Sequence, residues 1–385
     1  MDLFYEKYEE AILFYALKIK SSEVLSINTE EEDYAFARLL ATKAKAVTGN
    51  GSYIQLLRNG RIAEEFDILS DSPLSKSPTA FIYIPLYKKM DGIELGRVYE
   101  APELQRFKLL SDPLGNPAPS LPFLTCPLPC TTWDYMIDEE DGNNSSSTLL
   151  FNILGMENDD YLSRLDMRSD NLAYQKRKLN RMQLSKGRIV NDEGTDLEFS
   201  FLEGSEFTTT YAETQSGRVF NPFVYSSDIF RLLDPTSLNG WLNLTKPMMV
   251  FGKRISSFSI RFENGRVVEY KGNNFSEAVF KLYLEQDPNA GVASMLTLSE
   301  ISNLLEEEDL TGYPEFDRMR TVSITIGGPK GEAVTENTET RTIDSMVTLP
   351  LSCGSESTVI NVLDKDGEEW TIYSGGYLIE EEEDD

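Results

Sequence analysis

A strand-helix-strand pattern near the start of the chain sets the fold class of its first half. The apolar runs at residues 24–27 and 53–57 are typical of short buried strands, and the apolar residues between them recur with a helical period as far as Val47. Such a unit needs a crossover connection, which is right-handed and makes the two strands parallel. We therefore predict an α/β N-terminal domain over residues 1–200, with a parallel sheet that residues 80–87 extend.

Helical periodicity marks several further segments. Thr29 followed by Glu32 has the spacing of a capping box and predicts the start of the helix that runs to Val47. The other predicted helices cover residues 4–15, 171–184, 276–284 and 298–305.

Two turn signals set the fold class of the second half. Asn264-Gly265 and Asp366-Gly367 each separate two runs of alternating apolar residues, which is typical of β-hairpins. Strands joined in this way, with helical segments between them, predict a strand-rich α+β domain over residues 201–379. The remaining residues, 380–385, are all acidic, and we expect them to form a solvated tail.

Charge and composition exclude several kinds of partner. The chain has 36 basic and 64 acidic residues, a net charge of −28, which repels nucleic acid and anionic lipid surfaces. No basic leader precedes an apolar run at residues 1–18, and no apolar stretch reaches the length of a membrane span. We expect a cytoplasmic protein that binds neither nucleic acid nor membranes. Its three cysteines are too few for a disulfide framework.

The 385 residues include no histidine. This excludes Ser-His-Asp and Cys-His nucleophiles, a histidine general base and histidine-ligated zinc. Carboxylate chemistry, with or without a hard cation, remains open.

Several stretches in fixed order resemble one family, the two-metal aminopeptidases of the aminopeptidase T and aminopeptidase S type. They include the strand VLSI, the segment GTDLEF at residues 194–199, and SDIFRLLDPTSLNG followed by SIRFENGRVVE. The resemblance spans nearly the whole chain and implies the fold of that family. It also implies a homodimer with its interface largely on the C-terminal half.

The family's first metal ligands can be followed onto this sequence. Two adjacent glutamates before a Val-Phe pair, one of them a metal ligand, resemble Ser227 and Asp228 before Ile229-Phe230. A ligating glutamate in a Leu-Gly-Glu segment falls on Met295, whose thioether does not suit a hard or borderline cation.

The remaining ligands fall later in the chain. A ligand histidine of the family resembles Ser323, and the tyrosine that follows it seven residues later resembles Lys330. The family's His-Val-Asp-Phe-Met motif resembles the segment that begins with Thr342 and contains Asp344. Of five family ligands, only Asp344 is kept.

The resemblance therefore implies a degenerate member of the family. We expect the positions Ser227, Asp228, Met295, Ser323, Lys330, Thr342 and Asp344 to hold no metal pair, cofactor or catalytic set, and Asp344 to pair with Lys330 or Arg320. The expected function is that of a non-catalytic binding, scaffold or regulatory protein. Its partners would be a second copy of itself and a peptide or another protein.

Two enzymatic alternatives stay open. In the first, an active aminopeptidase has rebuilt its metal site from carboxylates, for which the candidates are Glu300, residues 306–308 and Asp317. In the second, Lys330 activates Ser227 or Ser323 as a nucleophile.

Overall fold

The chain forms two structural units, and each is made of two separate stretches of the sequence. The structure, a computed structural model, describes residues 3–58, 61–68, 77–84, 121–137, 145–300, 311, 313–328, 345 and 347–379. The first unit contains Met1–Ser169 and Thr210–Ser226, and the second contains Asp170–Thr209 and Ser227–Asp385. Residues 170–209 thus pack with the second unit, whereas the sequence analysis places one boundary near residue 200. As a division into separately folding domains, that boundary stays a prediction.

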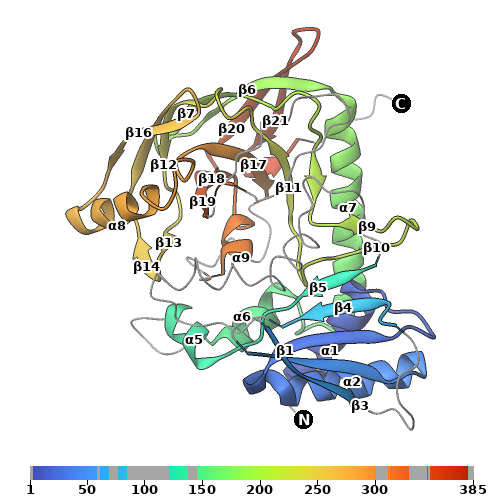
Figure 1. The fold of residues 1–385 in the computed structure, drawn as a ribbon. Coiled ribbons are helices and arrows are strands. Elements are labelled where there is room, and N and C mark those ends of the chain that lie inside the picture. The colour runs from blue at the N-terminus through green and yellow to red at the C-terminus, as the bar shows by residue number, and fades with distance from the viewer. Residues whose placement is uncertain are drawn as a thin grey trace. The chain divides into compact units, whose positions relative to one another are not determined.

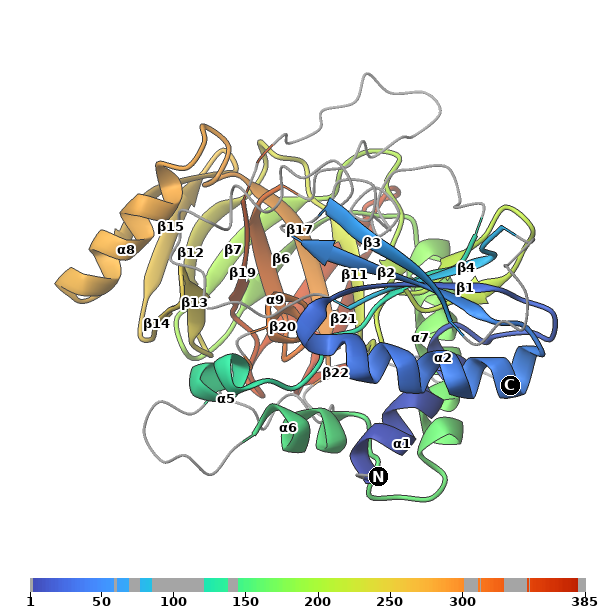
Figure 2. The ribbon, with the colours of Figure 1, turned by 60° about the horizontal axis from the view of Figure 1, so that its bottom comes forward.

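The first unit is built on a five-stranded sheet. Its strand order is β3-β2-β1-β4-β5, and every neighbouring pair is parallel except β2 and β3. The strands are β1 Leu25–Glu30, β2 Ser52–Arg58, β3 Arg61–Ile68, β4 Ala80–Tyr83 and β5 Phe123–Thr125. Helix α2, Tyr34–Thr48, connects β1 to β2 and packs on both strands (Figure 2). The predicted strand-helix-strand unit is confirmed.

Shorter elements complete the first unit. They are α1 Leu3–Glu10 with the π-helical turn Ala11–Ala16, α5 Thr131–Ile137, α6 Ser146–Ile153, the start of α7 Tyr161–Arg181, and the hairpin of β9 Ala212–Glu213 with β10 Val219–Phe220. The predicted capping box is wrong, because Thr29 belongs to β1 and pairs with Leu56, so that helix α2 begins after Asp33.

The second unit consists mainly of two antiparallel sheets (Figure 1). The larger has the order β16-β15-β12-β7-β6-β20-β21-β22, with β6 Leu184–Val190, β7 Asp196–Ser200, β12 Asn239–Asn243, β15 Ser259–Glu263, β16 Arg266–Lys271, β20 Val359–Asp364, β21 Glu369–Ser374 and β22 Tyr377–Leu378. The smaller has the order β19-β18-β17-β11-β8, with β8 Thr208–Thr209, β11 Asp228–Leu232, β17 Ala293–Ser299, β18 Ser323–Gly327 and β19 Thr348–Ser352. Helices α8 Asn274–Leu284 and α9 Pro314–Arg318 and the strand pair β13 Met248–Val250 and β14 Lys253–Ile255 complete it.

Every second side chain along these strands lies on the same sheet face, and the apolar side chains on such a face form the core of the second unit. In the large sheet, Ile189, Leu197 and Ile360 lie side by side on one face and are fully buried. Burying one such side chain is worth about 1.5–3 kcal/mol, so two apolar sheet faces supply most of the driving force for this fold. The predicted fold class, α/β with a parallel sheet followed by a strand-rich α+β part, is confirmed.

Helix predictions were less accurate than hairpin predictions. Residues 298 and 299, predicted to be helical, end strand β17, and residues 301–305 lie outside the described residues. Strand pairing on both sides of β17 overrides the local helical period there. Among the described helices, none combines the length and hydropathy needed to cross a bilayer.

Both predicted hairpins are present, and their glycines differ in the space available for a side chain. Gly265 (φ +75°) connects β15 to β16, and Gly367 (φ +89°) lies between β20 and β21. A Cβ at Gly265 would lie 1.9 Å from the carbonyl oxygen of Pro235, whereas a Cβ at Gly367 would meet nothing within 4 Å.

We predict that Gly265→Ala destabilises the protein much more than Gly367→Ala. The second change carries only the cost of a left-handed backbone, about 1–2 kcal/mol. The first adds a clash with backbone that must move, for a total of roughly 3 kcal/mol or more. Denaturant unfolding of the two variants measures the difference. Equal shifts of the unfolding midpoint would contradict the prediction.

Candidate functional site

The five-stranded sheet of the second unit has one apolar face and one polar face. The strand register places Ile229, Leu298 and Ile324 on the first face, together with Leu351. The opposite face carries Asp228, Thr297, Ser299, Ser323, Thr325 and Ser352. These six polar residues are all almost completely buried.

This polar face brings together four of the positions expected from the sequence. Asp228 and Met295 lie on it through β11 and β17, and Ser323 lies on it through β18. Ser227 immediately precedes β11. The other three positions, Lys330, Thr342 and Asp344, lie outside the described residues. The assignment of all seven to the family's active-site positions stays a prediction.

Asp228 is held by a cation that the sequence analysis did not identify. Both Nε and Nη2 of Arg318, at the end of helix α9, lie 3.0 Å from Oδ2 of Asp228. The Asp228 side chain is 0% exposed and that of Arg318 is 20% exposed. The guanidinium also lies 5.1 Å from the centre of the Phe230 ring. A carboxylate desolvated to this degree is stable only with such a charged partner.

The serines at family positions bind the backbone that follows α9. Ser323 Oγ donates to the carbonyl of Arg318 (3.3 Å), and Ser227 Oγ lies 3.4 Å from the carbonyl of Met319. Ser299 Oγ lies 2.6 Å from the same Met319 oxygen. Within the described part of the chain, no lysine or carboxylate bonds to Ser227 or Ser323. These hydroxyls therefore act as donors that fix the α9 segment, and no described base activates them.

Three other hydroxyls of the polar face have no hydrogen-bond partner among the described residues. They belong to Thr297, Thr325 and Ser352, which lie on three adjacent strands. A buried hydroxyl left unpaired costs about 1–3 kcal/mol. The face therefore presents polar atoms that need water or another polar group.

Glu300 and Asp317, the described acids among those proposed for a rebuilt metal site, form hydrogen bonds within the fold. Asp317 Oδ1 accepts from the backbone N and Oγ1 of Thr311 at 2.8 and 2.7 Å, and it lies 3.4 Å from Nε of Arg320. Glu300 accepts hydrogen bonds from Gln175 and from the backbone N of Leu378. Residues 306–308 lie outside the described residues. The described residues contain no group of three Cys, His, Asp or Glu side chains that could share a metal ion.

The donor set on this face does not fit the metal pair that the resemblance implies. Serine hydroxyls and a methionine thioether are poor ligands for divalent zinc, cobalt or manganese. The one described carboxylate on the face, that of Asp228, already binds a guanidinium.

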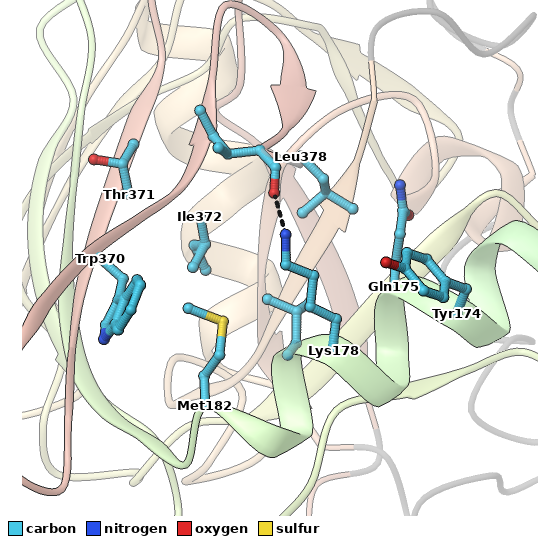
Figure 3. Close-up of a pocket in the computed structure, with 10 residues that line it drawn as sticks. Tyr174, Gln175, Lys178, Met182, Trp370, Thr371, Ile372 and Leu378 are labelled. Carbon is cyan, nitrogen blue, oxygen red and sulfur yellow. Dashed lines mark hydrogen bonds between the residues drawn. The ribbon is translucent and has the colours of Figure 1, made fainter. Parts of the chain in front are cut away.

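A separate pocket in the second unit is too small to bind a substrate. It lies between helix α7 and strands β21 and β22, and Figure 3 shows Trp370, Tyr174 and Met182 in its wall. Lys178 Nζ donates across it to the carbonyl of Ile379 at 3.2 Å (Figure 3). Its volume of about 30 Å³ accommodates roughly two water molecules.

Comparison with known proteins assigns the chain to a family. Residues 118–378 match the sequence profile of the thermophilic metalloproteases (M29), which is more than half of the chain. The chain belongs to the M29 family. Its fold is that of wild-type AmpT from Thermus thermophilus, with a TM-score of 0.70 and 16% identity over 98% of this chain and 99% of that one.

Two curated relatives give the scale of the sequence similarity. The chain is 25% identical to Aminopeptidase 2 of Geobacillus stearothermophilus, over 59% of its own length and 57% of that protein. It is 27% identical to Aminopeptidase T of Thermus aquaticus, over 45% of its own length and 44% of the relative. This M29 chain therefore matches only about half the length of its curated relatives.

The ion pair on the polar face of this M29 protein leads to a stability prediction. We expect Arg318→Met to destabilise the fold by about 3–5 kcal/mol, because it strands the buried Asp228 carboxylate. The double variant with Asp228→Asn should recover much of that loss, since no charge then remains uncompensated. Denaturant unfolding of the wild type, both single variants and the double variant measures the coupling.

An exposed ion pair of the same unit provides the matched control. Arg188 and Asp196 form two hydrogen bonds, both of 2.7 Å, and their side chains are 54% and 55% exposed. Arg188→Met should shift the unfolding midpoint little, because solvent screens this pair. A comparable loss at both arginines, or additive effects in the cycle, would show that Asp228 does not depend on Arg318.

Proposed function

We propose that this M29 protein is a non-catalytic homologue of the two-metal aminopeptidases and acts as a binding, scaffold or regulatory protein. The observation that carries the proposal is the Asp228–Arg318 pair, in which a half-buried guanidinium binds the buried carboxylate of the face where the family resemblance implies metal ligands. Asp228 could bind a divalent cation only by giving up this ion pair, which would leave a guanidinium without its partner.

The side chains of Ser227, Ser323 and Met295 also support a non-catalytic function. Two-metal catalysis needs ligands that hold two ions about 3.5–4 Å apart and polarise a bound water. Ser227 and Ser323 instead donate to backbone carbonyls of the α9 segment, and Met295 offers a thioether. An aminopeptidase with a metal site rebuilt from carboxylates is the second candidate. Of the acids proposed for such a site, residues 306–308 lie outside the described residues, and so does Asp344.

The first test is metal content combined with activity. Purified protein, dialysed against metal-free buffer and then offered zinc, cobalt or manganese, should retain no stoichiometric ion and should not cleave aminoacyl chromogenic substrates. Aminopeptidase T of Thermus aquaticus, treated in the same way, is the positive control. A chelator should leave the unfolding temperature of this chain unchanged, since no metal contributes to its stability. Two retained metal ions per chain with chelator-sensitive release of N-terminal amino acids would establish the rebuilt aminopeptidase instead.

We also propose a homodimer, as the resemblance implies. Sedimentation in moderate salt, which screens the repulsion between two chains of charge −28, should give twice the chain mass of 43.5 kDa. A monomer at micromolar concentration would overturn this part of the proposal.

A further inference from the structure

The first unit contains a polar cavity that is distinct from the family positions. Its volume is about 250 Å³, many times the space that one water molecule needs, so it has the size of a small ligand. The lining residues on which the ligand class depends are Lys20, Glu23, Leu121, Pro122, Ser216 and Arg218.

Arg218 forms the fixed charged wall of this cavity. Its side chain is 10% exposed and forms an ion pair with Glu23, which is 14% exposed. Its Nη2 donates to the carbonyls of Leu17 and Lys18. These bonds fix Arg218 and hold Glu23 in place at the cavity wall.

The loop beside Arg218 is held in a strained conformation. Lys18 (φ +48°) and Ser22 (φ +72°) both occupy the left-handed region without being glycine. Arg218 binds the carbonyl before this turn, and Glu23 Oε2 accepts from the backbone N of Lys20 at 2.7 Å. Strain of this kind persists only where the surroundings fix the backbone. The loop consequently presents Lys20 and Glu23 at fixed positions on the cavity wall.

The charges of the wall identify the class of ligand. The exposed Lys20 ammonium forms no ion pair with a described residue, so it can serve a carboxylate. Glu23 uses one lone pair of each oxygen for Arg218 and the Lys20 amide, which leaves further lone pairs for an ammonium group. The wall thus complements a ligand that carries one charge of each sign.

The net charge of the chain favours a zwitterionic ligand over a simple anion. A field from −28 charges opposes the approach of an anion but exerts no net force on a molecule without net charge. We propose that this cavity binds the ammonium and carboxylate groups of a small free α-amino acid, with its side chain toward Leu121 and Pro122. All the residues involved belong to the first unit, so the proposal is independent of the metal test.

Calorimetric titration of the full chain at moderate salt tests the ligand class. L-alanine should bind with one site per chain. L-lactate, which lacks the ammonium, and L-alaninamide, which lacks the carboxylate, should each bind at least tenfold more weakly, and inorganic phosphate should not compete. Lactate or phosphate binding as tightly as alanine would reveal an anion site and overturn the proposal. Equal binding of alaninamide, or no binding of alanine at millimolar concentration, would also overturn it.

Two variants place the ligand in the cavity. Lys20→Met should weaken alanine binding at least tenfold without changing the unfolding temperature, because that side chain is exposed. Ser216→Phe, also at an exposed position, should fill the cavity and abolish binding. Lys365→Met, in the exposed turn between β20 and β21, is the matched control and should bind as the wild type does. Unchanged binding in both cavity variants would show that the amino acid binds elsewhere.

Discussion

Successive side chains of β11, β17 and β18 point to opposite faces of the sheet, and the second unit depends on this constraint. One face of these strands must be apolar to pack in the core, so every second residue is committed to the opposite face. There Asp228 and Ser323 are buried next to helix α9, where water cannot solvate them. Arg318 and the backbone carbonyls after α9 supply the partners that water would otherwise provide. The position of α9 and the chemistry of the face are therefore linked.

The same link explains how an M29 chain can keep its fold without histidine. In the family resemblance, Ser323 stands where an imidazole ligand is expected, and its hydroxyl is satisfied by a carbonyl of its own chain. An ion pair can replace the metal-ligand bonds that would hold such a face together, provided that its charges remain matched. The fold does not depend on the side chains of the polar face alone, because the apolar face of the same strands packs in the core.

The sequence predicted elements best where one local rule decides the structure. Asn264-Gly265 and Asp366-Gly367 specify tight turns by backbone conformation alone, and both hairpins are present. The sequence pattern failed where tertiary pairing dominates, as at Leu298. The apolar spacing there predicts a helix, but the residue pairs with Ile229 in the sheet. The sequence pattern failed again at Thr29, whose capping pattern was overridden by the parallel pairing of β1 with β2.

The candidate site could be predicted in part for a similar reason. The order of family motifs located Asp228 and Ser323, but nothing in the sequence selects Arg318 rather than Arg320 as the partner of a buried acid. The two arginines are two residues apart, and the choice depends on the end of α9. There Arg318 reaches the polar face, while Arg320 donates to the carbonyls of Asp317 and Pro247. Residue type and spacing do not reveal where α9 ends relative to the sheet, so they could not identify which arginine pairs with Asp228.

The buried hydroxyls of the polar face distinguish it from a face packed as an apolar core. A face converted to simple packing would gain stability from apolar side chains of similar size, because each unpaired hydroxyl costs about 1–3 kcal/mol. The chain instead places Thr297, Thr325 and Ser352 on adjacent strands, without partners among the described residues. Three such groups together cost an appreciable fraction of the 5–15 kcal/mol that stabilises a typical domain, so ordered water or another polar group must offset them. Among the described residues, the face thus combines an ion-paired carboxylate with hydroxyls that need polar partners, and it is not packed as an apolar core.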